Sequence, residues 1–435
     1  MTTASVELWG KQIGAVTWDA SRGIGVFQYT PEFEASRIEV SPIRMPWREA
    51  PYEFQSLSRD TFKGLPGMLA DSLPDKFGNA LINVWLSSQG RNEGSFNPVE
   101  RLCYTGTRGM GALEYKPATI GTPTKARTVE IHRLVDLSNR ILNERENLAG
   151  TLSGGEDDAR YIEDILRVGT SAGGARAKAI LAWNETTGEF QSGQVQPGKD
   201  FSHWLIKFDG VDKNSDKELT DPQGFGRIEY AYYLMAKAAD ITMMPSRLHE
   251  EGGRAHFMTK RFDRTERGEK LHYQSLGALM HYDFNVAGAH SYEQAVQTIK
   301  TLKLPAIDRE QQVRRALFNI IARNQDDHVK NIGFVMDKEG EWRLSPAFDV
   351  AYSYNPYGDW TSKHQMSLNG KRDNFDMNDL VAFAQSAGIK ARTTKGIVAE
   401  IVEVVASWSE YADEAGVLDE HVDQIKRAVR VSAFS

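Results

Sequence analysis

Residues 324–331 read Asn-Gln-Asp-Asp-His-Val-Lys-Asn and follow an apolar helical pattern. Asn331 comes five positions after Asp326, a spacing that suits phosphoryl transfer. In that chemistry one side chain accepts the proton of an incoming hydroxyl, and a second holds magnesium against the phosphates of ATP. Asp349, in Ser-Pro-Ala-Phe-Asp-Val, comes eighteen positions after Asn331 and is expected to be a second magnesium ligand. Because the five-position step starts from Asp326, we interpret Asp326 as the base and Asp327 as a structural carboxylate. A solvated turn is the alternative.

The length and composition limit the possible functions. With 435 residues the chain is long enough for two or three substructures. Its hydrophobic share of 40% and charged share of 26% are ordinary for a soluble globular protein. The net charge is 52 − 59 = −7, so no strongly basic field attracts nucleic acid to the whole chain. We interpret a cluster of basic residues at 254–270 as a solvated hairpin rather than a nucleic-acid patch.

The cysteine content and the N-terminal residues bear on the compartment. One cysteine, Cys103, excludes an internal disulfide and a zinc site built from several cysteines. It lies in Arg-Leu-Cys-Tyr, which we interpret as a strand-like run with Cys103 in the core. The first residues lack a basic segment followed by an apolar one, and no window holds 18 uninterrupted apolar residues. We therefore expect a cytoplasmic protein without a membrane segment.

The order of the expected elements predicts two lobes. Strand and turn patterns fill residues 5–45, and a capped helix is expected to start at Asp71-Ser-Leu-Pro. The spacing of apolar residues then predicts helices at 129–148 and 224–239, strands at 178–183, 203–208 and 256–263, and helices at 309–322, 376–387, 393–413 and 419–432. This order favours an α+β, two-lobed fold over an alternating parallel sheet. The expected domains are an N-terminal α+β subdomain at 1–118, a strand-rich region at 119–300 and a mainly helical lobe at 301–435.

Two further features fit phosphoryl transfer. Residues 169–178, Gly-Thr-Ser-Ala-Gly-Gly-Ala-Arg-Ala-Lys, are small enough for backbone N–H groups to approach phosphate. This loop matches neither the Walker pattern nor Gly-x-Gly-x-x-Gly, and a plain hairpin loop is an equal alternative. Lys207 lies in the apolar strand Trp-Leu-Ile-Lys-Phe, where a kinase places its phosphate-binding lysine. A lysine on a solvent-exposed strand face would give the same pattern.

Together these segments resemble the HipA family of bacterial serine/threonine kinases, the toxins of HipBA toxin–antitoxin pairs. Residues 62–78 resemble the N-terminal signature of that family, and residues 170–178 resemble its ATP-binding loop. Residues 326–331 and 346–349 resemble its catalytic and metal-binding segments. The resemblance covers nearly the whole chain. It implies a two-lobed, protein-kinase-like fold that uses ATP and Mg²⁺.

The resemblance also implies roles for individual residues. Asp326 would be catalytic together with Lys207, and Asn331 and Asp349 would bind magnesium. Ser171 would be the autophosphorylated serine, whose phosphate silences kinases of this family by competing with the phosphates of ATP. The residues implied in ATP binding are Gly173, Gly174, Ala175, Arg176, Ala177, Lys178, Lys207, Lys260, Arg261, Phe262, His328, Lys330, Asn331, Phe348 and Asp349. The sequence departs from the founding member of the family at Arg176, Ala177 and Lys260, outside the catalytic positions.

The resemblance implies partners as well. The chain would be a growth-arresting toxin whose protein substrate is an aminoacyl-tRNA synthetase, with glutamyl-tRNA synthetase the best-known case in the family. A helix-turn-helix antitoxin like HipB would bind and restrain it, and contact with DNA would run mainly through that antitoxin. Two alternatives stay open. One is a non-catalytic nucleotide-binding subunit of a transcriptional repressor complex, and the other is a lipid or small-molecule kinase.

Overall fold

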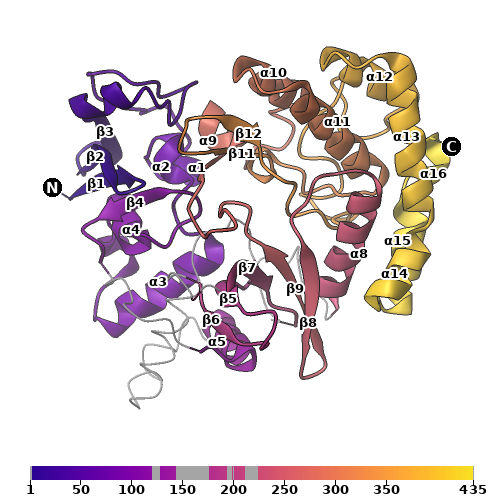
Figure 1. Ribbon diagram of the computed structural model, residues 1–435, viewed down its shortest axis with the longest axis horizontal. Coiled ribbons are helices and arrows are strands. Elements are labelled where there is room, and N and C mark those ends of the chain that lie inside the picture. Colours follow the sequence, from indigo (N-terminus) through magenta and orange to yellow (C-terminus); the bar gives the residue numbers. More distant parts are fainter. Residues whose placement is uncertain are drawn as a thin grey trace. The chain divides into compact units, whose positions relative to one another are not determined.

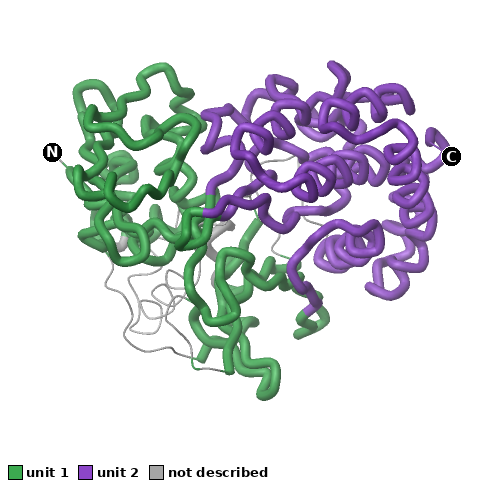
Figure 2. The backbone as a smooth tube through the Cα atoms, turned by 45° about the horizontal axis from the view of Figure 1, so that its top comes forward, with its two compact units in different colours: residues 1–223, 249–273, 336–340 green, residues 224–248, 274–335, 341–435 purple. Residues whose placement is uncertain are grey.

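The computed structural model describes residues 2–119, 128–143, 176–193, 198, 200–210 and 224–434. The chain folds into two compact units, each with most of its contacts inside itself (Figure 2). Unit 1 contains residues 1–223, 249–273 and 336–340, and unit 2 contains residues 224–248, 274–335 and 341–435. The chain therefore passes between the units five times. The region expected at 119–300 contributes residues to both units.

Unit 1 begins with a four-stranded antiparallel sheet of order β3-β2-β1-β4 (Figure 1). Its strands are β1 Thr3–Leu8, β2 Lys11–Asp19, β3 Ile24–Tyr29 and β4 Leu113–Lys116. Side chains of β1 alternate between buried and partly exposed, as a half-buried strand requires. Trp9 and Gly10, with φ of 50° and 77°, form the tight turn between β1 and β2. The expected strand and turn pattern is confirmed up to Tyr29, and a short 3-10 helix (Pro31–Ser36) follows.

Four helices connect β3 to β4. They are α1 Arg59–Phe62, α2 Gly67–Ala70, α3 Lys76–Ser88 and α4 Pro98–Thr105. The expected helix start at Asp71 is wrong by four positions. Asp75 caps α3 instead, because its Oδ1 accepts a hydrogen bond from Gly78 N at 2.7 Å.

The strand expected around Cys103 is also wrong, because this residue lies in α4. A capping box between Asn97 and Glu100, with a proline in the first turn, starts the helix. The apolar run therefore faces the core with helical rather than strand spacing. Cys103 is buried, as expected.

A second sheet has the order β6-β5-β7-β9-β8. Its strands are β5 Lys178–Trp183, β6 Phe190–Ser192, β7 Ser202–Lys207, β8 Ser246–Glu251 and β9 Arg254–Lys260. Leu181 of β5 pairs with Trp204 of β7, and both pack in one apolar core with α3 and α5 (Ile131–Asn143). The sheet therefore presents one face to these two helices and holds Lys178 and Lys207 at one end of its central strands.

The basic stretch at 254–270 differs from the solvated hairpin expected there. Asp263 is fully buried and accepts hydrogen bonds from Arg261 at 2.8 and 2.6 Å, from Arg264 at 2.8 Å and from Gly111 N at 2.6 Å. Burial alone would raise the pKa of Asp263, but the two guanidinium groups hold it well below its ordinary value. Lys270 donates to Glu114 at 2.7 Å. Several of these cations therefore balance internal carboxylates.

Unit 2 is mainly helical, as expected for the C-terminal part of the chain. Its helices are α8 Phe225–Ala238, α9 Leu276–Met280, α10 Tyr292–Thr301, α11 Ala306–Ile321, α12 Met377–Ser386, α13 Ala391–Ala406, α14 Trp408–Ala415, α15 Asp419–Ala428 and α16 Val431–Phe434. The helix expected at 393–413 is two helices that meet at Ser407, and the one expected at 419–432 ends at Ala428. A small sheet of order β10-β11-β12 consists of His272–Ser275, Gly333–Met336 and Trp342–Leu344.

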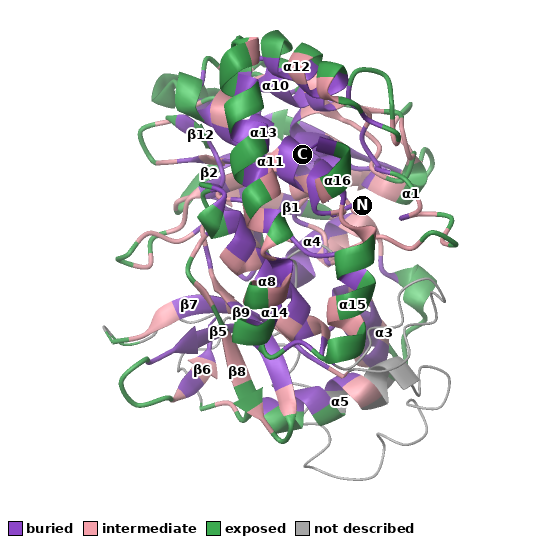
Figure 3. Cartoon of the chain, turned by 90° about the vertical axis from the view of Figure 1, so that its right-hand side faces the viewer, coloured by how far each residue is buried: buried purple, intermediate pink, exposed green. Residues whose placement is uncertain are grey.

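Helix α11 forms the centre of unit 2 and leads into the segment of interest. It packs against α10, α12 and α13. Figure 3 shows α11 largely buried, whereas α15 is largely exposed. In the part of the chain that the structure describes, no helix is both long and apolar enough to cross a bilayer.

Candidate functional site

The loop after α11 carries the residues expected to be catalytic. Arg323 adopts a left-handed backbone conformation with φ of 59°, which turns the chain out of the helix. Asn324 Nδ2 donates to Asn319 Oδ1 at 3.0 Å and ties the loop to the last turn of α11. A short 3-10 helix, η3 (Val329–Asn331), closes the loop. The loop is therefore fixed at both ends.

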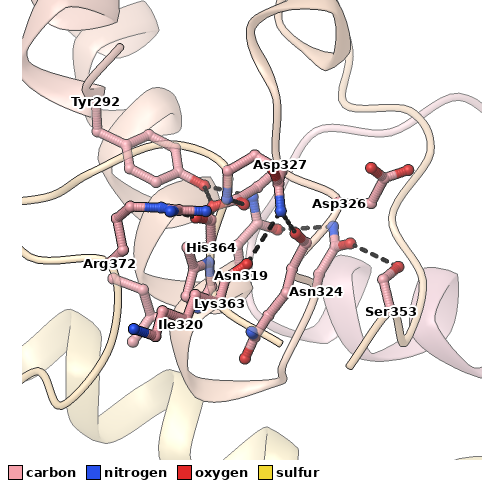
Figure 4. A network of polar contacts seen from close by, with 12 residues as sticks. Tyr292, Asn319, Ile320, Asn324, Asp326, Asp327, Ser353, Lys363, His364 and Arg372 are labelled. Carbon is pink, nitrogen blue, oxygen red and sulfur yellow. Dashed lines mark hydrogen bonds and ion pairs between the residues drawn. The ribbon is translucent and has the colours of Figure 1, made fainter. Parts of the chain in front are cut away.

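Asp327 lies within a buried polar network (Figure 4). Its Oδ2 accepts hydrogen bonds from Tyr292 Oη at 2.6 Å and His364 Nδ1 at 2.7 Å, and its Oδ1 accepts one from Gln365 N at 2.7 Å. Burial alone would raise the pKa of Asp327, but His364 and the other donors favour the carboxylate and hold the pKa below its ordinary value. The oxygens of Asp327 thus face protein donors, as a structural carboxylate requires.

Arg430 fixes the proton positions in this network. Arg430 Nη1, which can only donate, lies 3.1 Å from His364 Nε2. His364 Nε2 is therefore the acceptor, and the ring proton lies on Nδ1, which donates to Asp327. Arg430 also pairs with Asp373. Burial, together with nearby Arg323, lowers the pKa of Arg430 to about 10, so it is charged at neutral pH. Arg430, in the linker between α15 and α16, is therefore connected to Asp327 of the catalytic loop through His364.

Asp326 has different surroundings from its neighbour. Its side chain is 36% exposed, and Figure 4 shows its carboxylate pointing away from the network around Asp327. Oδ1 accepts a hydrogen bond from Trp360 Nε1 at 2.8 Å, and His328 Nε2 lies 3.8 Å from the same oxygen. Asn331 Nδ2 donates to the backbone oxygen of Asp326 at 2.8 Å. Among the described residues, Oδ2 has no hydrogen-bond donor, so it can accept a proton from a substrate.

A cavity of about 30 Å³ lies beside this loop, within unit 2. Asn331 and Asp349 both line it, as do His328 and Phe348. Four of the residues expected at the nucleotide and metal site therefore meet at one place. Asp349 has a left-handed backbone conformation with φ of 52°. Non-glycine residues rarely adopt this conformation, and those that do are concentrated at functional sites.

The donors at this cavity fit magnesium. Mg²⁺ takes oxygen ligands and needs only one or two from the protein when phosphates and water complete its octahedral shell. Because Asn331 uses Nδ2 for the backbone of Asp326, its Oδ1 remains an acceptor, and Asp349 adds a carboxylate. Within the described ranges, no group of three or more His, Cys, Asp or Glu residues is placed to hold a metal ion.

Lys330 lies at the edge of the loop. Its Nζ is 5.3 Å from the centre of the Phe284 ring, and the His328 ring is 5.5 Å from the same phenylalanine. Phe284 thus supports both side chains from the segment before α10. Contact of Lys330 with ATP stays a prediction.

The expected lysines of unit 1 lie directly opposite each other on neighbouring strands. Lys178 of β5 pairs with Lys207 of β7, so both side chains project from the same face of the sheet. Lys178 is buried and its Nζ lies 3.2 Å from Asp75 Oδ2. Lys207 is half-buried, with its Nζ 5.9 Å from the centre of the Phe257 ring. The ion pair gives Lys178 a structural role besides the ATP contact expected of it.

Three other residues of unit 1 expected at the ATP site, Lys260, Arg261 and Phe262, contact side chains of the same unit. Lys260 Nζ donates to the exposed Glu266 at 2.9 and 3.0 Å, and Arg261 binds Asp263 as described above. Phe262 packs against Tyr273 with ring centres 5.6 Å apart. Ala177 is buried in the core and Arg176 is half-buried. Ser171, Gly173, Gly174 and Ala175 lie outside the described residues, so their roles stay predictions.

Sequence reasoning missed four side chains around the loop, namely Tyr292, Trp360, His364 and Arg430. None of them lies within a motif of recognisable spacing. Trp360 and His364 come 34 and 37 positions after the aspartates they contact, so only tertiary structure brings them there. Arg315, on α11, is a further missed residue. It lines the cavity, and burial lowers its pKa to about 9.

Comparisons with known proteins agree with this architecture. A family model described as the HipA-like C-terminal domain matches residues 170–408, and one described as the HipA N-terminal domain matches residues 4–116. Putative kinase Y4mE of Sinorhizobium fredii is 23% identical over 213 residues, which cover 46% of this chain and 49% of that protein. Putative kinase Y4dM of the same organism is 24% identical over 211 residues, which cover 46% and 50%. The chain thus spans about half the length of these relatives.

The fold has a solved counterpart. A chain of the Shewanella oneidensis MR-1 toxin–antitoxin complex of HipA, HipB and operator DNA matches with a TM-score of 0.67 at 18% identity. The match covers 99% of this chain and 96% of that chain. This likeness confirms the expected two-lobed, kinase-like α+β fold.

Proposed function

This chain belongs to the HipA family, and on that premise we propose that it is an ATP- and magnesium-dependent protein kinase that acts on serine or threonine. The observation that carries the proposal is the meeting of Asn331 and Asp349 at one cavity beside the loop of Asp326. The family match and the relatives named as kinases support kinase activity in general. The oxygen donors at the cavity support the use of magnesium.

The proposed roles follow the geometry. Asp326 accepts the proton of the substrate hydroxyl on Oδ2, because Oδ1 already accepts the Trp360 N–H. Asn331 and Asp349 hold magnesium, which when bound neutralises charge on the phosphates of ATP. Asn331 has a second task, since its Nδ2 fixes the backbone of Asp326 at 2.8 Å. For Lys207 we propose, from the family resemblance alone, contact with the phosphates of ATP.

Phosphate transfer from [γ-³²P]ATP with purified protein tests these roles. Asp326→Asn and Asp349→Asn should abolish magnesium-dependent transfer. Asp423→Asn, which changes an exposed carboxylate of α15 in the same unit, is the matched control and should leave transfer unchanged. Transfer by the Asp326→Asn protein at the rate of the control would contradict the assignment.

We propose further that the kinase is a growth-arresting toxin with a translation component as substrate, such as glutamyl-tRNA synthetase or another aminoacyl-tRNA synthetase. A HipB-like helix-turn-helix protein would restrain it and link it to DNA. The family and the likeness to a chain from a HipA–HipB–DNA complex support the antitoxin partner. Phosphoproteomics after brief expression, comparing wild type with Asp326→Asn, would identify the substrate. An antitoxin partner should copurify with both proteins, and absence of any helix-turn-helix protein would count against it.

A further inference from the structure

Trp360 is the one side chain outside the loop that donates a hydrogen bond to the carboxylate of Asp326 in the described chain. Its Nε1 lies 2.8 Å from Asp326 Oδ1. Trp360 belongs to residues 354–365, which we call the support loop. This loop lies in unit 2, as does Asp326, so the contact is internal to one unit.

The backbone of the support loop is anchored on both sides of the base. Gln325 Nε2, from the residue before Asp326, donates to Thr361 O at 3.1 Å. Asp327 Oδ1, from the residue after it, accepts from Gln365 N at 2.7 Å. Gln365 Nε2 in turn donates to the backbone oxygens of Trp360 and, at 3.3 Å, of Gln325. The distance between the Trp360 backbone and the base is therefore set independently of the indole contact.

The Trp360 indole is half-buried, and its N–H donates to the carboxylate of Asp326. A carboxylate with one oxygen hydrogen-bonded to a rigid donor loses rotation about its terminal bond. With Oδ1 held by Trp360, Oδ2 is the oxygen presented to a substrate. Positioning a base within a few tenths of an ångström of its productive geometry contributes to the rate of the chemical step rather than to nucleotide binding.

We propose that Trp360 is a positioning residue that orients the catalytic base Asp326 through its indole N–H. The proposal rests on the function proposed for Asp326. It predicts that loss of the N–H lowers kcat and leaves KM for ATP unchanged. The ring itself can be kept, because Trp360→Phe removes the donor and retains an aromatic group on the support loop.

Kinetics of phosphate transfer test the proposal. Trp360→Phe should lower kcat about tenfold, as expected for loss of one hydrogen bond to a charged group, while KM for ATP stays within about twofold. Trp360→His, which keeps a ring N–H, should restore part of kcat. Trp9→Phe is the matched control, since the Trp9 indole also donates one hydrogen bond, to Lys270 O at 2.7 Å, but lies in unit 1. It should leave kcat unchanged, and a kcat for Trp360→Phe within twofold of wild type would overturn the proposal.

A second measurement does not depend on activity. The chain has 9 tryptophans, so ¹⁵N-tryptophan labelling gives nine indole N–H signals, and the signal missing in Trp360→Phe belongs to Trp360. That signal should shift in Asp326→Ala, which removes the acceptor, and the Trp9 signal should not. An unmoved Trp360 signal would overturn the contact. If the wild type transfers no phosphate, the proposed function fails instead, and the NMR comparison still decides whether the contact exists.

Discussion

Asp327→Asn should destabilise unit 2 and leave the chemistry at Asp326 in place. Asp327 presents two oxygens to three donors, Tyr292 Oη, His364 Nδ1 and Gln365 N, at 2.6 to 2.7 Å. An asparagine offers one oxygen and one NH₂ group, so at least one buried donor would face another donor. A buried donor left without a partner costs about 1–3 kcal/mol, and a hydrogen bond to a charged group contributes about 1.5–3 kcal/mol. We expect the free energy of unfolding to fall by about 3 kcal/mol.

Asp326→Asn is the matched variant one position away. Its side chain is 36% exposed, and the new amide oxygen can still accept the Trp360 N–H. We therefore expect a change in unfolding free energy within about 0.5 kcal/mol, together with loss of phosphate transfer. Asp327→Asn should thus lower stability, whereas Asp326→Asn should abolish phosphate transfer without lowering stability.

Two assays on the same protein samples measure this separation. Hydrogen–deuterium exchange of peptides from residues 319–331, combined with urea unfolding, reports the stability of the loop and of α11. Phosphate transfer divided by the folded fraction reports the chemistry. The reasoning is refuted if Asp327→Asn abolishes transfer without loss of stability, or if Asp326→Asn keeps transfer.

Three further predictions concern other parts of the chain. Burial lowers the pKa of both His203 and His272 to about 4, so their contribution to stability is fully present above about pH 6.5 and is lost as the pH falls toward 4. Each histidine should lower the free energy of unfolding of unit 1 by about 1 kcal/mol between pH 7 and pH 5.5, because the unfolded chain binds a proton that the folded chain does not. His272→Gln should make thermal unfolding less dependent on pH in this range. Arg430→Ala removes the donor to His364 Nε2, so amide protection of the loop at 324–331 should fall by about 1–3 kcal/mol, and unchanged protection would contradict the coupling. Ser171→Ala should greatly reduce self-phosphorylation, measured by mass spectrometry of tryptic peptides, while phosphorylation of other proteins survives; an undiminished signal would count against the loop assignment.

The features that sequence could predict are those set by local order. Asp326, Asn331 and Asp349 stand in short segments whose spacing reflects a single loop and the turn after a strand, and the structure places Asn331 and Asp349 at one cavity beside the loop of Asp326. The different environments of Asp326 and Asp327 also fit the interpretation made from spacing, because one is half-exposed and the other is buried.

The features that sequence could not predict depend on distant contacts. Asp263 binds two basic residues, Arg261 and Arg264, in the interior of unit 1, which no periodicity reveals. The run around Cys103 is apolar enough for a strand, but the capping residues before it select a helix. Trp360 and Arg430 reach the catalytic loop only because the chain folds back from far along its length.

The five passages between the units have a consequence for the order in which this protein can be made. In the sheet of unit 1, β9 lies between β7 and β8, yet it follows α8 of unit 2 along the chain. A nascent chain that has emerged only to residue 223 therefore exposes an unpaired β7 edge, which is a template for wrong pairing. Unit 1 gains its last residues, 336–340, after the whole catalytic loop of unit 2, residues 324–331, has been synthesised. No single cut in the chain therefore separates the two units, because each is built from three segments that alternate along the sequence.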